Sequence, residues 1–372
     1  MRKRIPKILV TGGAGFIGSA FVRLLLKEWG RFYSCRRGGL NLPYGLVIID
    51  KLTYAGDLQR LEEVKGKFKF YKTDICNKSS IQSIFQKERP DIVVHFAAES
   101  HVDRSINNAA PFIDTNIKGT QILLDVSREY KIVKFIYISS DEVYGEILEG
   151  KFSENSPIKA SSPYAASKAA ADLLVQSYIR TYKFPAIIIR PSNNYGPWQY
   201  PEKLIPLAIQ RILDGGKVPV YGKGLNVREW LYVDDCARGI LKIMQKGKNG
   251  EIYNLGSGQE SKNIDTTKLL LKTLGVGQNR FKFVKDRLGH DIRYSLDSRK
   301  ITRKIGWKPG VKLAQGLEFT VNWYLLHKNW LLSKQHKERC IMKRKIRDYN
   351  MPIGRLTRVK DFLLSPEVKK CL

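Results

Sequence analysis

Two short segments hold residue types that together could act on an alcohol carbon. Ser140 follows an apolar run and precedes an adjacent pair of acids, Asp141 and Glu142, and Tyr164 and Lys168 come soon after. Residues four apart share one face of a helix, so the Lys168 ammonium is expected to lower the pKa of the Tyr164 phenol. Tyrosinate is then available as a base, Ser140 can bond the same substrate oxygen, and the two carboxyl groups can serve as acid and base.

The elements that position these residues follow from the alternation of apolar runs with helix-length segments. Ser161-Ser162-Pro163 is a helix-start signal directly before Tyr164. This alternation is typical of a parallel sheet with helices on both faces, so the predicted fold class is α/β, a doubly wound Rossmann-type sheet with a smaller C-terminal α/β substrate-binding lobe. The strands are predicted at residues 7–10, 46–49, 68–71, 92–96, 135–138 and 186–189.

Three glycines mark a turn between the first predicted strand and a helix. Gly12, Gly15 and Gly18 allow a tight turn and a close approach to a pyrophosphate at the helix N-terminus. Asp50 ends the second predicted strand, where a carboxylate accepts from ribose hydroxyls and repels a 2′-phosphate. The turn therefore predicts NAD as cofactor. Asp50 lies farther from Gly18 than the roughly twenty residues typical of this motif, which we attribute to a polar insertion near Arg31–Tyr44.

Composition bounds the class of protein. The chain has 372 residues with 43% hydrophobic content, enough for a large core. No run approaches eighteen apolar residues and no signal peptide is evident, so we expect a cytoplasmic protein without a membrane span. The cysteines are scattered, without a Cys-x-x-Cys pair, which predicts reduced thiols and no metal site. They are Cys35, Cys76, Cys236, Cys340 and Cys371.

The net charge of +30 raises nucleic acid as a partner. The positive charge is spread along the chain, without one basic stripe interleaved with aromatics, and it also suits a phosphate-bearing small substrate. We therefore do not expect nucleic-acid binding. The predicted domains are an NAD-binding domain with the catalytic residues over 1–190, a mainly substrate-binding lobe over 191–330 with some segments returning to the sheet, and a basic tail over 331–372.

Six segments of the chain, together with the spacing of the glycine turn, resemble the dTDP-glucose 4,6-dehydratase family of the extended short-chain dehydrogenase/reductase superfamily. The likeness covers roughly residues 5 to 330. The segments are Asp50–Gly56, Ala97–Ser105, Asp141–Gly145, Ser192–Pro197, Pro201–Pro206 and Asp286–Asp291.

The resemblance implies an NAD-dependent hydro-lyase of deoxysugar biosynthesis that converts dTDP-glucose to its 4-keto-6-deoxy product and water. It implies that Tyr164 is the base in C4 oxidation, that Glu142 removes the C5 proton and that Asp141 protonates the departing C6 hydroxyl. The bound NADH then returns its hydride to C6, so that no external reductant is needed. A homodimer through the helices that follow Pro111 and Pro163 is also implied.

The resemblance further implies two sets of contacts. The cofactor contacts are Gly12, Gly15, Phe16, Ile17, Gly18, Asp50, Lys51, Thr53, Asp74, Ile75, Ala97, Ala98, Ser100, Thr115, Tyr164, Lys168 and Asn194. The substrate contacts are Ser100, Ser140, Asn193, Lys203, Leu204, Pro219, Tyr221, Arg228, Asn263, Arg287 and His290. The chain departs from the family at Ser140, where the family has threonine, and at Leu288, where it has proline. The first change keeps the hydroxyl, and the second leaves a less rigid turn.

Two other interpretations remain open. A UDP-sugar epimerase or decarboxylase of the same superfamily would use the tyrosine, lysine and serine without an acid at position 141, so Asp141 is the residue that discriminates. A basic binding protein without catalytic activity would keep the fold and use the tail as its binding arm. That interpretation predicts damaged catalytic positions, and the sequence shows none.

Overall fold

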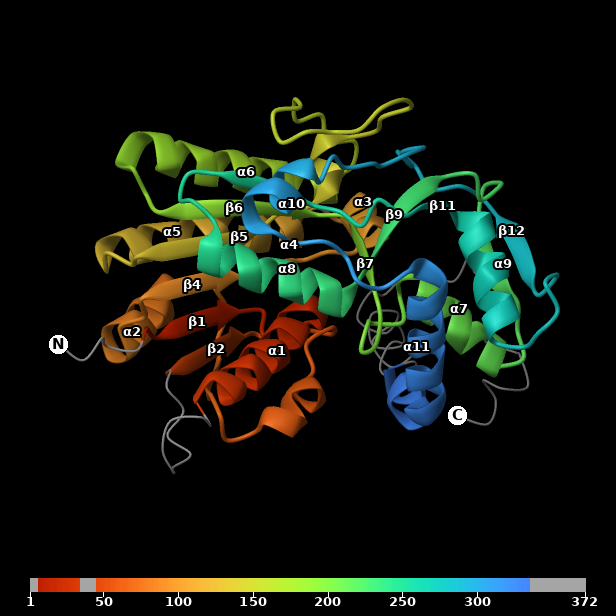
Figure 1. The fold of residues 1–372 in the computed structure, drawn as a ribbon, viewed down its shortest axis with the longest axis horizontal. Coiled ribbons are helices and arrows are strands. Elements are labelled where there is room, and N and C mark those ends of the chain that lie inside the picture. The colour runs from red at the N-terminus through yellow and green to blue at the C-terminus, as the bar shows by residue number, and fades with distance from the viewer. Residues whose placement is uncertain (1–5, 34–44, 335–372) are drawn as a thin grey trace, which may run out of the picture. The chain divides into compact units, whose positions relative to one another are not determined.

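The predicted catalytic residues follow a strand of a seven-stranded parallel sheet (Figure 1). Its strand order is β10-β6-β5-β4-β1-β2-β3, and every neighbouring pair is parallel. This confirms the predicted doubly wound class. The strands are β1 (Ile8–Thr11), β2 (Leu46–Asp50), β3 (Lys69–Lys72), β4 (Ile92–His95), β5 (Lys134–Ile138), β6 (Ala186–Pro191) and β10 (Ile252–Leu255).

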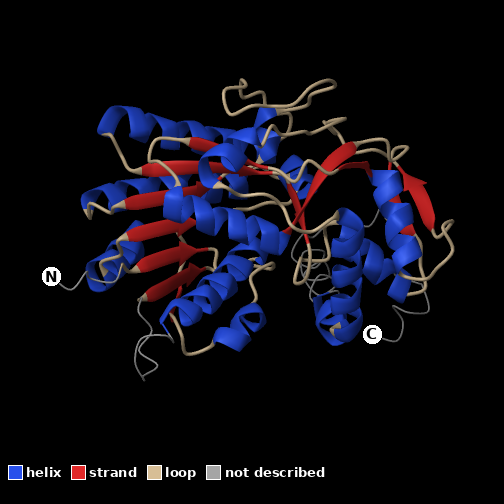
Figure 2. Cartoon of the chain, in the orientation of Figure 1, coloured by secondary structure: helices blue, strands red, loops and turns tan. Residues whose placement is uncertain are grey.

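Helices cover both faces of this sheet because successive strand residues point to opposite sides. In β1, Ile8 and Val10 enter one apolar core and Leu9 enters the other. The first core is closed by α1 (Phe16–Tyr33), α8 (Val233–Lys246) and α10 (Arg299–Ile305). The second is closed by α2 (Lys78–Glu88), α5 (Gly119–Glu129) and α6 (Pro163–Tyr182). Figure 2 shows these helices flanking the strands.

Parallel strands end at the same edge of a sheet, so the segments that follow them meet there. The glycine turn follows β1, Ala97 follows β4, Ser140 follows β5 and Asn193 follows β6. Residues that are far apart in sequence are thereby gathered at one edge. The short helical elements on the way are the 3₁₀ helix η1 (Leu58–Val64), α3 (Val102–Asn107), α4 (Ala110–Phe112), the π-helical η2 (Ile113–Lys118) and the 3₁₀ helix η3 (Asp141–Tyr144).

The C-terminal part of the chain supplies a smaller α/β group of elements. Strands β7 (Asn193–Tyr195), β9 (Val227–Tyr232) and β11 (Glu260–Lys262) form one sheet in the order β11-β9-β7, and β8 (Val218–Tyr221) pairs with β12 (Phe281–Val284). Helices α7 (Leu204–Leu213), α9 (Asn263–Thr273) and α11 (Leu313–Leu326) pack with them. Strand β10 returns from this part of the chain to the large sheet.

The computed structural model describes residues 6–33 and 45–334. Residues Met1–Leu326 form one compact unit and His327–Leu372 form a second, in which residues 328–334 are helical. The predicted insertion and basic tail fall almost entirely outside the described residues. The proposed boundaries at 190 and 330 stay predictions. Within the described ranges, no helix is long and apolar enough to cross a membrane.

Candidate active site

The acidic pair lies on a short 3₁₀ turn that is fixed at both ends. Ser140 caps η3 in an extended conformation, and its Oγ accepts a hydrogen bond from the Glu142 N–H at 3.2 Å. The turn ends at Gly145, whose φ of +78° favours glycine. A Cβ at Gly145 would lie only 2.2 Å from the Lys159 carbonyl oxygen. The turn therefore presents Asp141 and Glu142 together at the end of β5.

Tyr164 reaches the same place from the first turn of α6. The helix begins as predicted, because Ser162 Oγ accepts from the Ala165 N–H at 3.1 Å and Pro163 occupies the first turn. The Tyr164 N–H donates to Ser105 Oγ at 3.0 Å. The phenol is buried, and the Ser140 side chain is near enough to act on its pKa. The two predicted hydroxyl groups therefore lie in the same site.

Lys168 does not act on Tyr164 as the four-residue spacing predicts. Its Nζ donates to the Ile138 carbonyl oxygen at 2.6 Å and lies 4.5 Å from the centroid of the Tyr137 ring. Burial lowers the pKa of Lys168 to about 7. Burial, reinforced by the charge of Glu142, raises the pKa of Tyr164. The expected lowering of the tyrosine pKa is therefore wrong for this structure, because desolvation of the phenol outweighs the opposing effect of the Ser140 side chain.

The two carboxyl groups differ in their charge environments. Asp141 is 2% exposed, and its Oδ2 has no hydrogen-bond partner. Burial, together with Glu142 and Glu229, raises the pKa of Asp141 well above its usual range. Burial also raises the pKa of Glu142, but three cations act in the opposite direction: Lys203, Arg228 and Arg287. The environment therefore favours the protonated form at both carboxyl groups, and more strongly at Asp141 than at Glu142.

The glycine turn has the close packing that a dinucleotide site requires. Gly12 has a φ of +68°, and a Cβ there would lie 2.6 Å from the Ala97 nitrogen. A Cβ on Gly18 would lie 2.2 Å from the Gly12 carbonyl oxygen. The Asp50 carboxylate is held beside the turn, since it accepts from the Ala14 N–H at 3.0 Å and from the Leu52 N–H at 2.8 Å. With the N-terminal N–H groups of α1 alongside, these residues fit NAD.

The other predicted cofactor residues lie in loops at the same edge of the sheet. Lys51 follows β2 and pairs with Asp74 at 2.5 Å, which brings the loops after β2 and β3 together. The Ala97 N–H donates to Thr11 Oγ1 at 3.3 Å. The remaining members are found in the loops after β2, β3 and β4, in η2 and in β7: Thr53, Ile75, Ala98, Ser100, Thr115 and Asn194.

Two predicted substrate residues bind to the α3 region of the N-terminal half. Lys203 Nζ donates to the Ser100 carbonyl oxygen at 2.7 Å. The Arg287 guanidinium donates to both Asp103 carboxylate oxygens, at 2.7 and 2.9 Å. A cationic pair is thereby placed next to the acidic turn, where both charges act on Glu142. Such groups suit the diphosphate of a nucleotide sugar.

Further predicted substrate residues offer polar atoms without a partner. The Oδ1 atoms of Asn193 and Asn263 are buried and make no hydrogen bond. Buried polar atoms are nearly always satisfied, so these two atoms fit hydrogen-bond donors of a ligand. Arg228 is buried, donates to the Asp291 carbonyl oxygen at 2.9 Å and lies 4.2 Å from the Tyr294 ring centroid.

Tyr221 and His290, two further predicted substrate residues, lie beside Arg287. Tyr221 of β8 lies beneath its guanidinium, 5.2 Å from ring centroid to Cζ. His290 Nδ1 is 2.7 Å from Asp286 Oδ1, and its ring meets Tyr221 edge-on. Pro219 is on the same strand as Tyr221, and Leu204 begins α7.

The sequence did not indicate two further groups of charged residues, one around Glu202 and one at Asp172 and Arg190. Glu202 accepts from the Tyr54 hydroxyl at 2.9 Å and pairs with Arg104 at 3.4 Å. Asp172 binds Arg190 through two hydrogen bonds of 2.8 and 2.9 Å, and the pair lies buried beneath the site. The Pro-Glu-Lys run around Glu202 was a usable signal, because it lies inside a segment already singled out. Asp172 and Arg190 gave no local signal, since their contact is visible only in the fold.

Comparison with known proteins agrees with this geometry. The family described as GDP-mannose 4,6 dehydratase matches residues 9–320. A dTDP-glucose 4,6-dehydratase of an Actinoplanes species is 45% identical over 329 residues, which cover 87% of this chain and 99% of that protein. The low-salt glycan biosynthesis protein Agl12 of Haloferax volcanii is 46% identical over 320 residues, covering 86% and 98%.

A solved structure is similar over the same extent. The crystal structure of DesIV, a dTDP-glucose 4,6-dehydratase from Streptomyces venezuelae solved with NAD bound, aligns with a TM-score of 0.81 and 46% identity. The alignment covers 87% of this chain and 98% of that one. Relatives of this identity, matched over nearly their whole length, place the chain without ambiguity. It belongs to the dTDP-glucose 4,6-dehydratase family, within the extended short-chain dehydrogenase/reductase superfamily.

Proposed function

We propose that this protein is an NAD-dependent hydro-lyase that converts dTDP-glucose to dTDP-4-keto-6-deoxyglucose and water. The observation that carries the proposal is the acidic pair on the turn after β5, beside Tyr164 and Ser140, in which the protonated form is favoured more strongly at Asp141 than at Glu142. A dehydration needs an acid for the leaving hydroxyl and a base for the neighbouring C–H, and the two must titrate apart.

The protein moves protons in three places. Tyr164, as tyrosinate, takes the proton of the C4 hydroxyl, and Ser140 orients that oxygen. Burial raises the pKa of Tyr164 in the protein alone, and the positive charge of a bound nicotinamide would act in the opposite direction. Glu142 removes the C5 proton, which the C4 ketone has made acidic. Asp141 then donates its proton to the C6 hydroxyl, which leaves as water. When the C5–C6 double bond is reduced, Glu142 returns its proton to C5. Tyr164 then releases the C4 proton and Asp141 takes up one proton, which restores all three groups for the next cycle.

NAD, when bound, supplies the hydride acceptor at C4 and the same hydride for C6, so the cofactor ends each turnover as it began. The glycine turn and Asp50 support NAD as the dinucleotide, because the Asp50 carboxylate beside the turn disfavours a 2′-phosphate. Lys168 donates to the carbonyl of Ile138, two residues before Ser140, and would hold the ribose at the nicotinamide end of the bound cofactor.

The thymidine nucleotide is supported by the relatives, and the diphosphate by the cations on the site. Asp141 favours dehydration over the epimerase and decarboxylase alternatives, since those reactions use no acid at this position. Every position of the catalytic set carries a competent side chain, which disfavours a binding protein without activity.

We further propose a homodimer. The π-helical η2 that precedes α5 leaves Ile113 exposed, and α6 leaves Leu173 and Tyr182 exposed, which supports an interface formed by these elements. Light scattering after size exclusion tests this state, and Leu173→Glu is expected to shift the mass to that of a monomer. A cytoplasmic location stays a prediction, which cell fractionation tests.

The function is tested by incubating the purified protein with dTDP-glucose and, in parallel, with UDP-glucose, CDP-glucose and GDP-mannose. The expected result is a 4-keto-6-deoxy sugar nucleotide, detected by its absorbance in alkali, from dTDP-glucose alone and without added reductant. Epimerised sugar, or no product from any of the four substrates, would contradict the proposal.

A further inference from the structure

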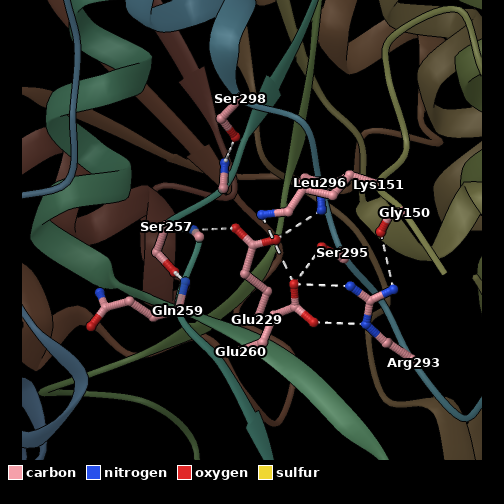
Figure 3. Close-up of polar contacts among 12 residues, drawn as sticks. Gly150, Lys151, Glu229, Ser257, Gln259, Glu260, Arg293, Ser295, Leu296 and Ser298 are labelled. Carbon is pink, nitrogen blue, oxygen red and sulfur yellow. Dashed lines mark hydrogen bonds and ion pairs between the residues drawn. The ribbon is translucent and has the colours of Figure 1, made fainter. Parts of the chain in front are cut away.

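Two carboxylates face each other across the small sheet behind the catalytic turn. Glu229 of β9 is registered opposite Glu260 of the antiparallel β11. Figure 3 shows both carboxylates directed at residues 293–297, a segment that we call the strap. Like charges opposite each other in a sheet repel unless each is satisfied separately. What each carboxylate binds therefore defines its role.

In the contacts that Figure 3 draws, the Glu229 carboxylate accepts hydrogen bonds only from backbone N–H groups. Its side chain is fully buried, Oε1 accepts from the Gly258 N–H at 2.7 Å and Oε2 accepts from the Leu296 N–H at 2.8 Å. A Cβ on Gly256 would lie 2.2 Å from Glu229 Oε1, so the carboxylate fills the space that a side chain there would need. Both oxygens are thereby locked in place.

Glu260, in contrast, is neutralised by cations. It accepts from Arg293 through two hydrogen bonds of 2.7 and 3.0 Å and from Ser295 Oγ at 2.7 Å (Figure 3). Lys151 Nζ is 3.9 Å away. The two facing carboxylates thus hold the same strap, but Glu260 forms an ion pair with it and Glu229 accepts from a peptide N–H.

The strap supports the catalytic turn from behind. Leu296 belongs to one apolar cluster with Val143 and Tyr144 of η3 and with Phe152. The Phe152 N–H donates to the carbonyl oxygen of Ser295, the residue before Leu296, at 2.9 Å. This hydrogen bond also holds the strap in place. A displacement of Leu296 is therefore passed directly to the turn that carries Asp141 and Glu142.

We propose that Glu229 is a positioning residue for the acid Asp141. It fixes the strap against the η3 turn through Leu296, and it keeps a negative charge behind the Asp141 carboxyl. This inference rests on the proposed function, because it assigns to Asp141 the role of proton donor.

The charged and titratable groups that face Asp141 come from three elements. They are Glu142 on η3 itself, Arg228 and Glu229 on β9, and the phenol of Tyr164 on α6. After burial, Glu142 and Glu229 raise the pKa of Asp141, and Arg228 opposes them. Burial raises the pKa of Glu229 itself, but the two backbone N–H donors of Gly258 and Leu296 and the charge of Lys151 favour its carboxylate form, and Glu260 opposes it. Removing the charge of Glu229 should lower the pKa of Asp141, so the acid should lose its proton at a lower pH.

The test is the pH profile of kcat for Glu229→Gln, with Glu260→Gln as the matched control. An acid works below its pKa, so the alkaline limb of Glu229→Gln should move to lower pH by about one unit, a roughly tenfold loss of kcat on that limb. Glu260→Gln loosens the strap, so we expect a lower melting temperature with the limb unmoved. Gly256→Ala should shift the limb as Glu229→Gln does, because the added Cβ displaces the carboxylate without removing an ionisable group.

A limb that stays at the wild-type position in folded Glu229→Gln, or that moves equally in Glu260→Gln, would overturn the proposal. If Glu229→Gln does not fold, Gly256→Ala decides, since a limb that stays at the wild-type position in that variant would overturn the proposal. Carbon NMR titration of the Asp141 carboxyl in wild type and Glu229→Gln reads the same shift without substrate. A wild-type protein that is inactive on dTDP-glucose would contradict the proposed function, whereas unequal titration of Asp141 would still support the role of Glu229.

Discussion

The Asp103 carboxylate binds the Arg287 guanidinium through two hydrogen bonds of 2.7 and 2.9 Å, although 184 residues separate them along the chain. The side chains are 30% and 22% exposed. This contact holds a cation of the C-terminal half against α3, close to the acidic turn. It therefore presets the position of Arg287 before the sugar nucleotide binds.

Replacing Asp103 by Asn should weaken substrate binding more than turnover. The guanidinium loses one charge-assisted partner and must be ordered when the diphosphate arrives. A partly exposed ion pair is worth roughly 0.2 to 1 kcal/mol, so we expect KM to rise about two- to fivefold at nearly constant kcat. Steady-state kinetics measure both constants. An unchanged KM in Asp103→Asn would show that Arg287 is positioned by other groups.

Tyr164→Phe should abolish the first chemical step. Phenylalanine keeps the packing of the ring but cannot take the C4 proton, so the rate should fall by roughly 10² to 10⁴. No reduced nicotinamide should appear by near-ultraviolet absorbance when substrate is added. Calorimetric binding of dTDP-glucose serves as the control and should persist, and a variant that oxidised C4 normally would remove Tyr164 from its proposed role.

Asp141→Asn should stop the reaction one step later. The amide has the shape of the acid but cannot donate a proton to the C6 hydroxyl, so reduced nicotinamide should accumulate while water loss falls by roughly 10² to 10⁴. Rapid mixing with absorbance detection, together with product analysis, separates the two steps. Wild-type amounts of product from Asp141→Asn would contradict the assignment of the acid.

Lys203→Met should move the acidic limb of the pH profile. Glu142 must be ionised to act as base, so activity falls as the pH drops through its pKa, which burial raises and Lys203 lowers. Loss of Lys203 should raise that pKa further, so the acidic limb of kcat at saturating substrate should shift to higher pH by up to about one unit. The exposed Lys223→Met is the matched control, for which the limb should not move.

Asp172→Asn should destabilise the fold beneath the site. Arg190 is 1% exposed, and Asp172 is the carboxylate that it binds. Removing one partner of a buried pair leaves an uncompensated charge and costs about 3 to 5 kcal/mol in the free energy of unfolding. Urea denaturation measures this loss. Glu62→Gln, which removes the exposed pair with Lys65, should cost no more than about 1 kcal/mol, and equal costs for the two variants would contradict the prediction.

The parts of the fold that depend on local sequence pattern could be predicted from the sequence. Short apolar runs predicted each strand of the large sheet except β10, and the serine and proline before Tyr164 predicted the start of α6. The glycine spacing placed the cofactor turn, because a backbone that approaches itself so closely has no room for a Cβ. These signals need no knowledge of distant residues.

The electrostatics of the site depend on distant residues and could not be predicted in the same way. The spacing of Tyr164 and Lys168 is local, but the burial that raises the tyrosine pKa and the Ile138 carbonyl that takes up the lysine arise from the assembled sheet. Glu229 likewise meets Leu296 only after the chain has folded. A pattern of residue types identifies which groups react and leaves their proton affinities open.

The strap has a consequence for biosynthesis of the protein. The ribosome completes the turn of Asp141 and Glu142 long before it makes Leu296, which closes the apolar cluster behind that turn. A growing chain can form the first strands of the large sheet before Leu296 packs against the turn that holds its acid and base. Chains that terminate before residue 293 are therefore expected to keep the dinucleotide-binding glycine turn but to lack dehydratase activity.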